Sequence, residues 1–292
     1  MSLLRTPRRI YRVLALAAVF AYSILEVLIT RPRTRALRAA WLSRIGNRLL
    51  RTQDITFTTV GPVPMHGAVI TNHLTYVDII IHGSIRPCVF VSKIELRKTP
   101  VFGWVSMMAG TIYIDRASSR AGSITKAAEG MSKGFRDNLP VVFFPEGTTG
   151  VGDVPTLPFR SGLLHLAIAE KQPVTAGFIH YDLTPYDLAR DKSTRNDVHW
   201  GHETLWQHLW NFADLHGVHG TITFAPEPIA FSEAALKNRK IAGHEAQAAI
   251  NALAVPIQQP NLTAGTSIPG PRLTGTAAKS IPQPESRTPS SP

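Results

Sequence analysis

Short apolar runs alternate with amphipathic segments from residue 54 to residue 253, and this alternation predicts the fold. Runs rich in β-branched and aromatic residues indicate strands at 54–60, 67–72, 88–92, 111–115, 141–144, 174–180 and 221–224. Segments with helical spacing of apolar positions indicate helices at 77–83, 101–109, 122–135, 162–170, 203–215 and 232–253. Such alternation predicts an α/β fold: a mixed, mostly parallel sheet flanked by helices, with active residues on loops that leave the carboxyl ends of strands.

The N-terminal residues follow a different pattern, typical of a membrane anchor. Residues 13–29 are predominantly apolar, but this stretch rises only about 26 Å, short of a hydrocarbon core of about 30 Å. The next segment predicts an interfacial helix with an aromatic anchor, because apolar residues recur every four positions at Leu37, Trp41, Ile45 and Leu49. We favour a helical hairpin embedded in one leaflet. A single transmembrane span is the alternative, since arginines flank the apolar stretch equally and give no orientation.

These patterns divide the chain into three parts. Residues 1–52 form a basic membrane anchor, made of the apolar helix and the interfacial helix. Residues 53–255 form the α/β domain. Residues 256–292 are rich in Pro, Ser and Thr with few large apolar side chains, so we expect a disordered tail.

The formal net charge of +11 is concentrated in the first part. Residues 1–51 contain eleven arginines and a single acid, Glu26, whereas the remaining residues are close to neutral. Beside an apolar stretch, this excess predicts attraction to anionic lipid headgroups; a nucleic-acid-binding arm is the alternative. The single cysteine, Cys88, excludes an internal disulfide framework and fits a reducing compartment, so we expect the α/β domain on the cytoplasmic face of a membrane.

One histidine and one aspartate stand out, five positions apart after the apolar run 67–70. On a continuous helix their side chains would diverge by about 140°. They can meet only if His73 lies on the turn leaving a strand and Asp78 lies in the first turn of the next helix. Asp78 would then bond one imidazole nitrogen, and the other nitrogen could activate a substrate hydroxyl as a general base. The alternative is a core histidine and a helix-start aspartate that never touch.

Further blocks follow in order. They are the strand 110–116 that begins at Gly110 and ends in Asp115-Arg116, the turn 143–149 with Pro145-Glu146-Gly147-Thr148, and the segments 90–95, 100–104 and 158–162. Together with His73-x4-Asp78, over residues 56–255, they resemble the glycerolipid acyltransferases of the lysophosphatidic acid acyltransferase type. The resemblance implies a membrane-bound enzyme that moves a fatty acyl chain from acyl-ACP or acyl-CoA to a lysolipid hydroxyl. The co-substrate is that thioester, with no further cofactor and no metal.

The resemblance also implies roles for individual residues. His73 and Asp78 would be catalytic. The acceptor would be bound by Gly110, Arg116, Glu146, Gly147, Thr148 and Arg160, with Gly110 allowing close backbone approach and Arg116 holding a phosphate or carboxylate. Glu146 would orient the acceptor or hold a neighbouring loop.

The chain departs from the family pattern at one position: Thr149 stands where arginine usually follows Glu-Gly-Thr. One phosphate-binding cation is thereby lost, unless Arg160 restores the charge. The leading acceptor is 1-acyl-glycerol-3-phosphate, giving phosphatidic acid. A lyso-ornithine lipid or another lysophospholipid is the rival.

Other classes of function are disfavoured by specific features. Intact His73 and Asp78 argue against a non-catalytic lipid-binding protein on the same fold. A hydrolase is disfavoured because no Gly-x-Ser-x-Gly motif is present. The histidines at 199, 202, 208, 216 and 219 lack the spacing of a structural zinc site.

Overall fold

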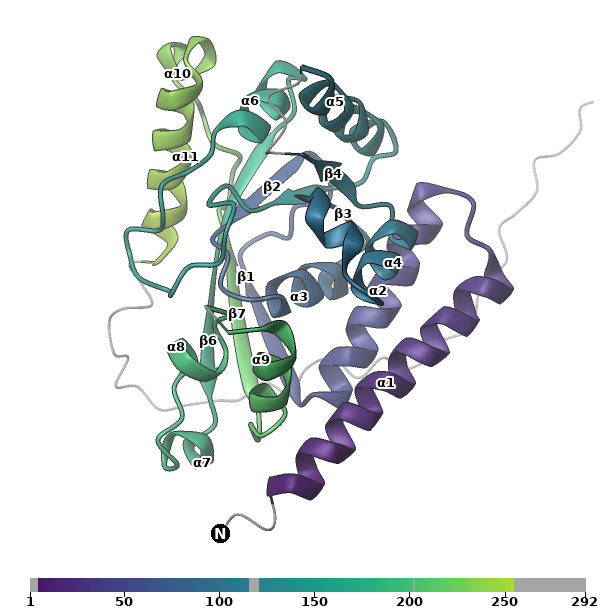
Figure 1. Cartoon of the computed structure of the whole chain (residues 1–292). Helices are drawn as coiled ribbons and strands as arrows, with labels where there is room; N and C mark the ends of the chain where they lie inside the picture. The colour runs from purple at the N-terminus through teal and green to yellow at the C-terminus, as the bar shows by residue number, and fades with distance from the viewer. Residues whose placement is uncertain (1–4, 116–120, 202, 255–292) are drawn as a thin grey trace, which may run out of the picture. The chain divides into compact units, whose positions relative to one another are not determined.

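The computed structural model describes residues 5–115, 121–201 and 203–254 (Figure 1). Its centre is a seven-stranded sheet in the order β1-β7-β6-β2-β5-β3-β4. The strands are β1 (Ile55–Val60), β2 (Ala68–Thr71), β3 (Val89–Lys93), β4 (Ile112–Ile114), β5 (Val141–Phe143), β6 (Val174–Leu183) and β7 (Val218–Phe224). In this order, each neighbouring pair of strands from β6 to β4 is parallel. Strand β7 is antiparallel to β6, and β1 pairs with β7 in parallel. The prediction of a mixed, mostly parallel sheet flanked by helices is confirmed.

Helices cover both faces of this sheet because its strand residues alternate between two cores. Ile70 and Phe143 face the layer of α5 (Ala121–Arg136), α6 (Gly162–Ala169) and α11 (Arg239–Ala254). Val69 and Val142 face the layer of α3 (Val77–Ile85) and α9 (Leu205–Phe212). The smaller elements are η1 (Ile94–Lys98), α4 (Phe102–Met108), α7 (Pro185–Leu188), α8 (Thr194–Asp197) and α10 (Glu233–Lys237).

The expected helix 232–253 is two helices, α10 and α11, separated at Asn238. Asn238 has extended backbone angles (φ −131°, ψ 109°), and its side-chain oxygen accepts a hydrogen bond from Lys240 N at 2.9 Å. An asparagine that bonds the backbone two residues on competes with continuous helix, which explains the break.

Two N-terminal helices, α1 (Arg5–Thr30) and α2 (Arg35–Thr52), lie beside the sheet, with α2 between α1 and α3 (Figure 1). The apolar stripe on α2 faces the protein: Trp41, Ile45 and Leu49 are buried, and Trp41 Nε1 donates to Ser23 O of α1 at 3.0 Å. The prediction of lipid contact is therefore wrong for these three residues, whereas Leu37, the first position of the stripe, is 54% exposed. Helical periodicity identifies the apolar face of a helix but not what covers it.

Helix α1 turns its charged side chains toward the protein. Arg12 is 2% exposed; it donates to Leu215 O at 2.6 Å and pairs with Asp54. Near the other end, Glu26 pairs with Arg44 and Arg48 of α2, each at 2.5 Å. The first contacts fix the N-terminal half of α1 to the α/β domain, and the second fix its C-terminal half to α2.

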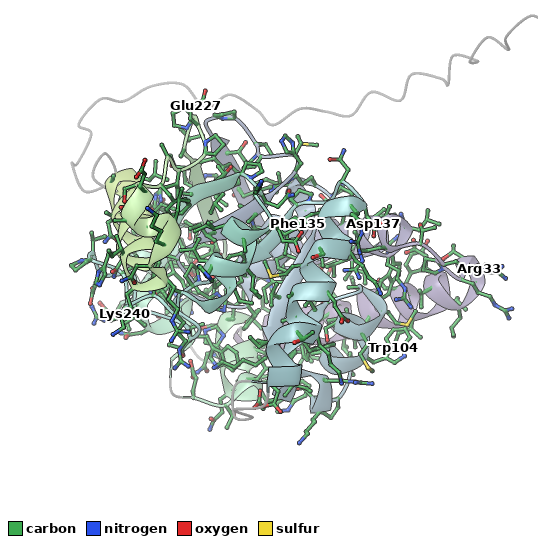
Figure 2. The ribbon with its side chains drawn as sticks, turned by 90° about the horizontal axis from the view of Figure 1, so that it is seen from above. Arg33, Trp104, Phe135, Asp137, Glu227 and Lys240 are labelled. Carbon is green, nitrogen blue, oxygen red and sulfur yellow. The ribbon has the colours of Figure 1, made fainter. Side chains whose placement is uncertain are left out.

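The opposite face of α1 is apolar and exposed, with Leu14 63%, Leu25 55%, Leu28 59% and Ile29 71% accessible. By length and composition the stretch Pro7–Thr30 could cross a membrane. Beyond it, Arg33 lies at the outer end of the α1–α2 pair (Figure 2).

Candidate active site

The turn between β2 and α3 brings His73 and Asp78 together. His73 follows the end of β2, and Asp78 lies in the first turn of α3. His73 Nδ1 is 2.7 Å from Asp78 Oδ2. Asp78 is fully buried, whereas the His73 side chain is 17% exposed. The two therefore form a pair in which only the histidine reaches the surface.

Asp78 receives hydrogen bonds from several donors besides the imidazole. Its Oδ2 accepts from Leu74 N at 2.7 Å and Thr75 N at 3.0 Å, and its Oδ1 accepts from the Tyr181 hydroxyl at 2.6 Å. Donors of this kind stabilise the ionised carboxylate. An ionised carboxylate only accepts, so the proton of a neutral His73 ring lies on Nδ1 and its Nε2 can take up a proton.

The His73 ring is held by stacking as well. It lies on Phe144, with ring centroids 4.0 Å apart and planes inclined by 10°. His82 packs edge-on against the same phenylalanine, at a centroid distance of 6.0 Å. Burial lowers the pKa of His82 to about 3, so this second histidine is neutral and serves as packing.

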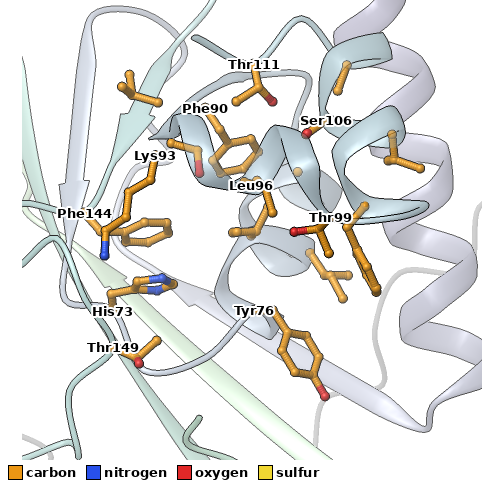
Figure 3. A pocket seen from close by; sticks show the side chains of 18 of the residues that line it. His73, Tyr76, Phe90, Lys93, Leu96, Thr99, Ser106, Thr111, Phe144 and Thr149 are labelled. Carbon is orange, nitrogen blue, oxygen red and sulfur yellow. The ribbon is translucent and has the colours of Figure 1, made fainter. Parts of the chain in front are cut away.

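His73 lies on the wall of a cavity of about 570 Å³ (Figure 3). Most of the cavity wall is apolar, and helices α1 and α2 contribute to it. The apolar lining includes Phe20, Leu42, Ile45, Leu49, Ile79, Ile80, Phe90, Leu96, Phe102 and Val105. A cavity of this size and character is typical of a site for a largely hydrophobic ligand.

Polar groups gather around the His73 end. Gly147, Thr148 and Thr149 line the cavity there, and Lys93 extends toward the His73 ring (Figure 3). Glu95 lies on the same lining. Lys93 was not among the site residues expected from the sequence. Its position directly after a predicted strand, within one of the matched blocks, was the available signal.

Thr149 does not take the place of the missing arginine. Its hydroxyl donates to Trp200 O at 2.6 Å, and Trp200 N donates to Leu74 O at 2.8 Å. Thr149 thus attaches the loop containing Trp200, another cavity residue, to the turn that carries His73.

Glu146 holds the backbone around His73 and is not among the described residues that line the cavity. Its two oxygens accept from His73 N at 2.8 Å and Leu157 N at 3.2 Å. Burial raises the pKa of Glu146 to about 7, although these hydrogen bonds oppose the shift. Gly147 follows with φ +71°, a conformation that favours glycine. Of the two roles expected for Glu146, the geometry favours holding the neighbouring loop.

Comparison with known proteins fits this arrangement. A family model described as Acyltransferase matches residues 54–178, which contain the His73–Asp78 turn and the Glu146 turn. The 1-acyl-sn-glycerol-3-phosphate acyltransferase of Neisseria meningitidis serogroup B is 31% identical over 150 residues, covering 50% of this chain and 58% of that protein. Over these residues the chain is similar to the glycerolipid acyltransferases, as the resemblance in its sequence indicated.

Other relatives in the family carry different names. The lyso-ornithine lipid O-acyltransferase of Pseudomonas aeruginosa is 36% identical over 124 residues, covering 42% of this chain and 45% of that protein. These matches span less than two thirds of either relative's length. The crystal structure of the 1-acyl-sn-glycerophosphate acyltransferase of Thermotoga maritima shares the fold, with a TM-score of 0.60 and 18% identity over 87% of this chain and 97% of that one.

Three residues expected from the family resemblance are not among the described residues that line the cavity. Gly110 lies between two lining residues, Ala109 and Thr111, and its φ of +79° favours glycine; close approach of a substrate there stays a prediction. Arg160 is exposed and is not among the described lining residues, so the structure does not bring its charge to the cavity. Arg116 lies outside the described residues.

The histidines of the C-terminal half have separate partners. His199 Nδ1 bonds Val151 O, His208 bonds Tyr76, His216 bonds Asp187, and His219 bonds Thr56 and Thr58. Within residues 5–115, 121–201 and 203–254 no three His, Cys, Asp or Glu side chains group as metal ligands would. His202 lies outside these ranges.

Proposed function

We propose that this chain is a membrane-attached O-acyltransferase that transfers a fatty acyl chain from acyl-ACP or acyl-CoA to the free hydroxyl of a lysolipid. The observation that carries the proposal is the oriented His73 on the wall of a large apolar cavity. The cavity offers space for an acyl chain, and His73 offers a base for an alcohol. The names of the relatives support the same class of reaction.

The proposed chemistry needs no protein nucleophile and no cofactor. His73 Nε2 removes the proton of the acceptor hydroxyl as the oxygen attacks the thioester carbonyl. The tetrahedral intermediate then expels the thiolate, which takes the proton back from the imidazolium, leaving an ester and a free thiol. Asp78 stabilises the imidazolium throughout, as the aspartate of a serine triad does, with the lipid hydroxyl in place of the serine.

The headgroup of the acceptor is proposed to lie at the polar end of the cavity. Lys93 supplies a cation there, while Gly147 and Thr148 offer backbone and hydroxyl donors. Arg116 remains a proposed second headgroup contact, and Glu146 acts by positioning His73.

The leading acceptor is 1-acyl-glycerol-3-phosphate, giving phosphatidic acid, as in the Neisseria relative's name. A lyso-ornithine lipid is the second candidate, and two observations favour it. Thr149 bonds a protein loop where the family usually places an arginine, and Lys93 and Glu95 line the cavity together. A cavity lining that contains both a cation and an anion suits a headgroup that itself carries both charges better than a phosphomonoester.

Attachment to one leaflet is proposed through the exposed apolar face of α1. Trp206 and Trp210 of α9 are 62% and 40% exposed, and the Arg9 guanidinium lies 5.6 Å from the Trp210 ring, a pairing suited to the headgroup region. We place the domain on the cytoplasmic side, where the thioester donors are made. Protection of the extreme N terminus from protease in sealed vesicles would contradict this single-leaflet arrangement.

An acceptor panel tests the function. Purified enzyme is assayed with labelled acyl-ACP and acyl-CoA against lysophosphatidic acid, lyso-ornithine lipid and lysophosphatidylcholine. We expect His73→Ala to abolish transfer to the preferred acceptor while vesicle binding is unchanged. Full activity in this variant would remove His73 from the mechanism, and inactivity of the wild type with every pair would refute the proposed function.

A further inference from the structure

Strand β6 holds a tyrosine against the catalytic pair. Tyr181 is 5% exposed, and its hydroxyl donates to Asp78 Oδ1 at 2.6 Å. Burial and the nearby charge of Asp78 raise the pKa of Tyr181, so the phenol keeps its proton and remains a donor. The residue lies beyond position 178, where the family match ends.

The same strand also fixes the start of the catalytic turn. The side-chain amide of Asn72 donates to Ile179 O at 2.8 Å, and its carbonyl accepts from Ile179 N at 2.7 Å. Asn72 thereby continues the pairing of β2 with β6 after the last paired residue, Thr71. Two residues further along β6, Tyr181 reaches Asp78, so one strand holds the turn at both ends.

We propose that Tyr181 is a positioning residue for acyl transfer: its hydroxyl holds the Asp78 carboxylate in place, and so keeps His73 oriented with Nε2 free to accept a proton. The proposal rests on the proposed function. Asp78 Oδ2 has three N–H donors, whereas Tyr181 is the hydroxyl donor to Oδ1. Without that donor, the buried Oδ1 loses its hydrogen bond, and the carboxylate can turn away from His73 Nδ1.

The test is Tyr181→Phe in the full-length enzyme, with kcat and KM measured separately for the donor and the acceptor. We expect about a tenfold loss of kcat, the scale of a hydrogen bond to a charged group. KM for both substrates should stay unchanged, because Tyr181 is not among the described residues that line the cavity. Tyr186→Phe, which removes the same hydroxyl from an exposed ring on α7, is the matched control and should behave as wild type.

Two results would overturn the proposal: an unchanged kcat, or a loss of kcat accompanied by a comparable rise in KM, which indicates a merely structural role. Asp78→Asn provides a second comparison. If Tyr181 acts through the Asp78 carboxylate, its removal from the Asp78→Asn enzyme should cost clearly less than tenfold in kcat; an undiminished loss contradicts the proposal. Absence of transfer by the wild type would instead refute the proposed function, so the two failures are distinguishable.

Discussion

The charge of Asp78 can be separated from its hydrogen bonds by the substitution Asp78→Asn. In the wild type, Leu74 N and Thr75 N both point at Oδ2. An asparagine must place its carbonyl oxygen there, because its NH₂ group would face two N–H donors. The NH₂ group then faces the Tyr181 hydroxyl, which can rotate to accept. The oxygen still accepts from His73 Nδ1, so the tautomer is kept and only the charge is lost.

The expected magnitude follows from that charge. Two unit charges about 4 Å apart interact by about 4 kcal/mol at an effective dielectric constant of about 20. At about 1.4 kcal/mol per tenfold change, kcat should fall roughly 10³-fold. This is less than the loss of about 10⁴ in a serine triad, where the equivalent change imposes the wrong tautomer.

The assay is transfer of labelled acyl chains to the preferred acceptor, with kcat and KM determined separately. KM for both substrates should be unchanged in Asp78→Asn. Asp182→Asn, which removes an exposed carboxylate from β6, is the matched control and should retain activity. A loss of less than tenfold would mean that the carboxylate charge is not used. A loss as complete as that of His73→Ala would mean that the asparagine does not preserve the tautomer.

Three further changes test other parts of the structure. Glu146→Gln should remove a pH dependence of the free energy of unfolding. Because the pKa of Glu146 is raised to about 7, the folded protein keeps a proton that the unfolded chain loses near pH 4.5. The free energy of unfolding of the wild type therefore falls by up to about 3 kcal/mol as the pH rises from about 4.5 to about 7. Unfolding midpoints at several pH values measure it, and equal slopes in both proteins would contradict the assignment. Val105→Phe narrows the cavity and should shift donor preference toward shorter acyl chains in a chain-length panel; an unchanged profile would place the acyl chain elsewhere. Arg86 is 4% exposed, and its three guanidinium nitrogens have no hydrogen-bond partner among the described residues. Burial lowers the pKa of Arg86, because a buried charge without partners is costly. Arg86→Met should therefore raise the melting temperature; a lower melting temperature would show that the charge is compensated.

Local patterns predicted the features that depend on near neighbours in sequence. The alternation of strands and helices gave the sheet, because strand periodicity and helix periodicity are set within each segment. The pairing of His73 with Asp78 could be anticipated for the same reason: both lie on one strand-to-helix turn. The catalytic roles of these residues remain predictions.

Features that depend on distant partners could not be read in this way. The α2 stripe was assigned to lipid because nothing local reveals that α1, α3 and α4 cover it. Tyr181 contacts Asp78 across 103 positions, and no motif marks it. The function of Glu146 was left between two roles, since its bond to the backbone of His73 joins residues 73 positions apart.

The inward charges of α1 impose an order on biosynthesis. This helix leaves the ribosome well before two of its partners, since the carbonyl that receives Arg12 belongs to Leu215 and the carboxylate that pairs with Arg9 belongs to Asp214. Arg12 can meet Asp54 once 42 further residues have been translated, but Leu215 follows Arg12 by 203 positions. Complete docking of α1 therefore requires nearly the whole α/β domain, whereas its exposed apolar face is available to a bilayer from the start.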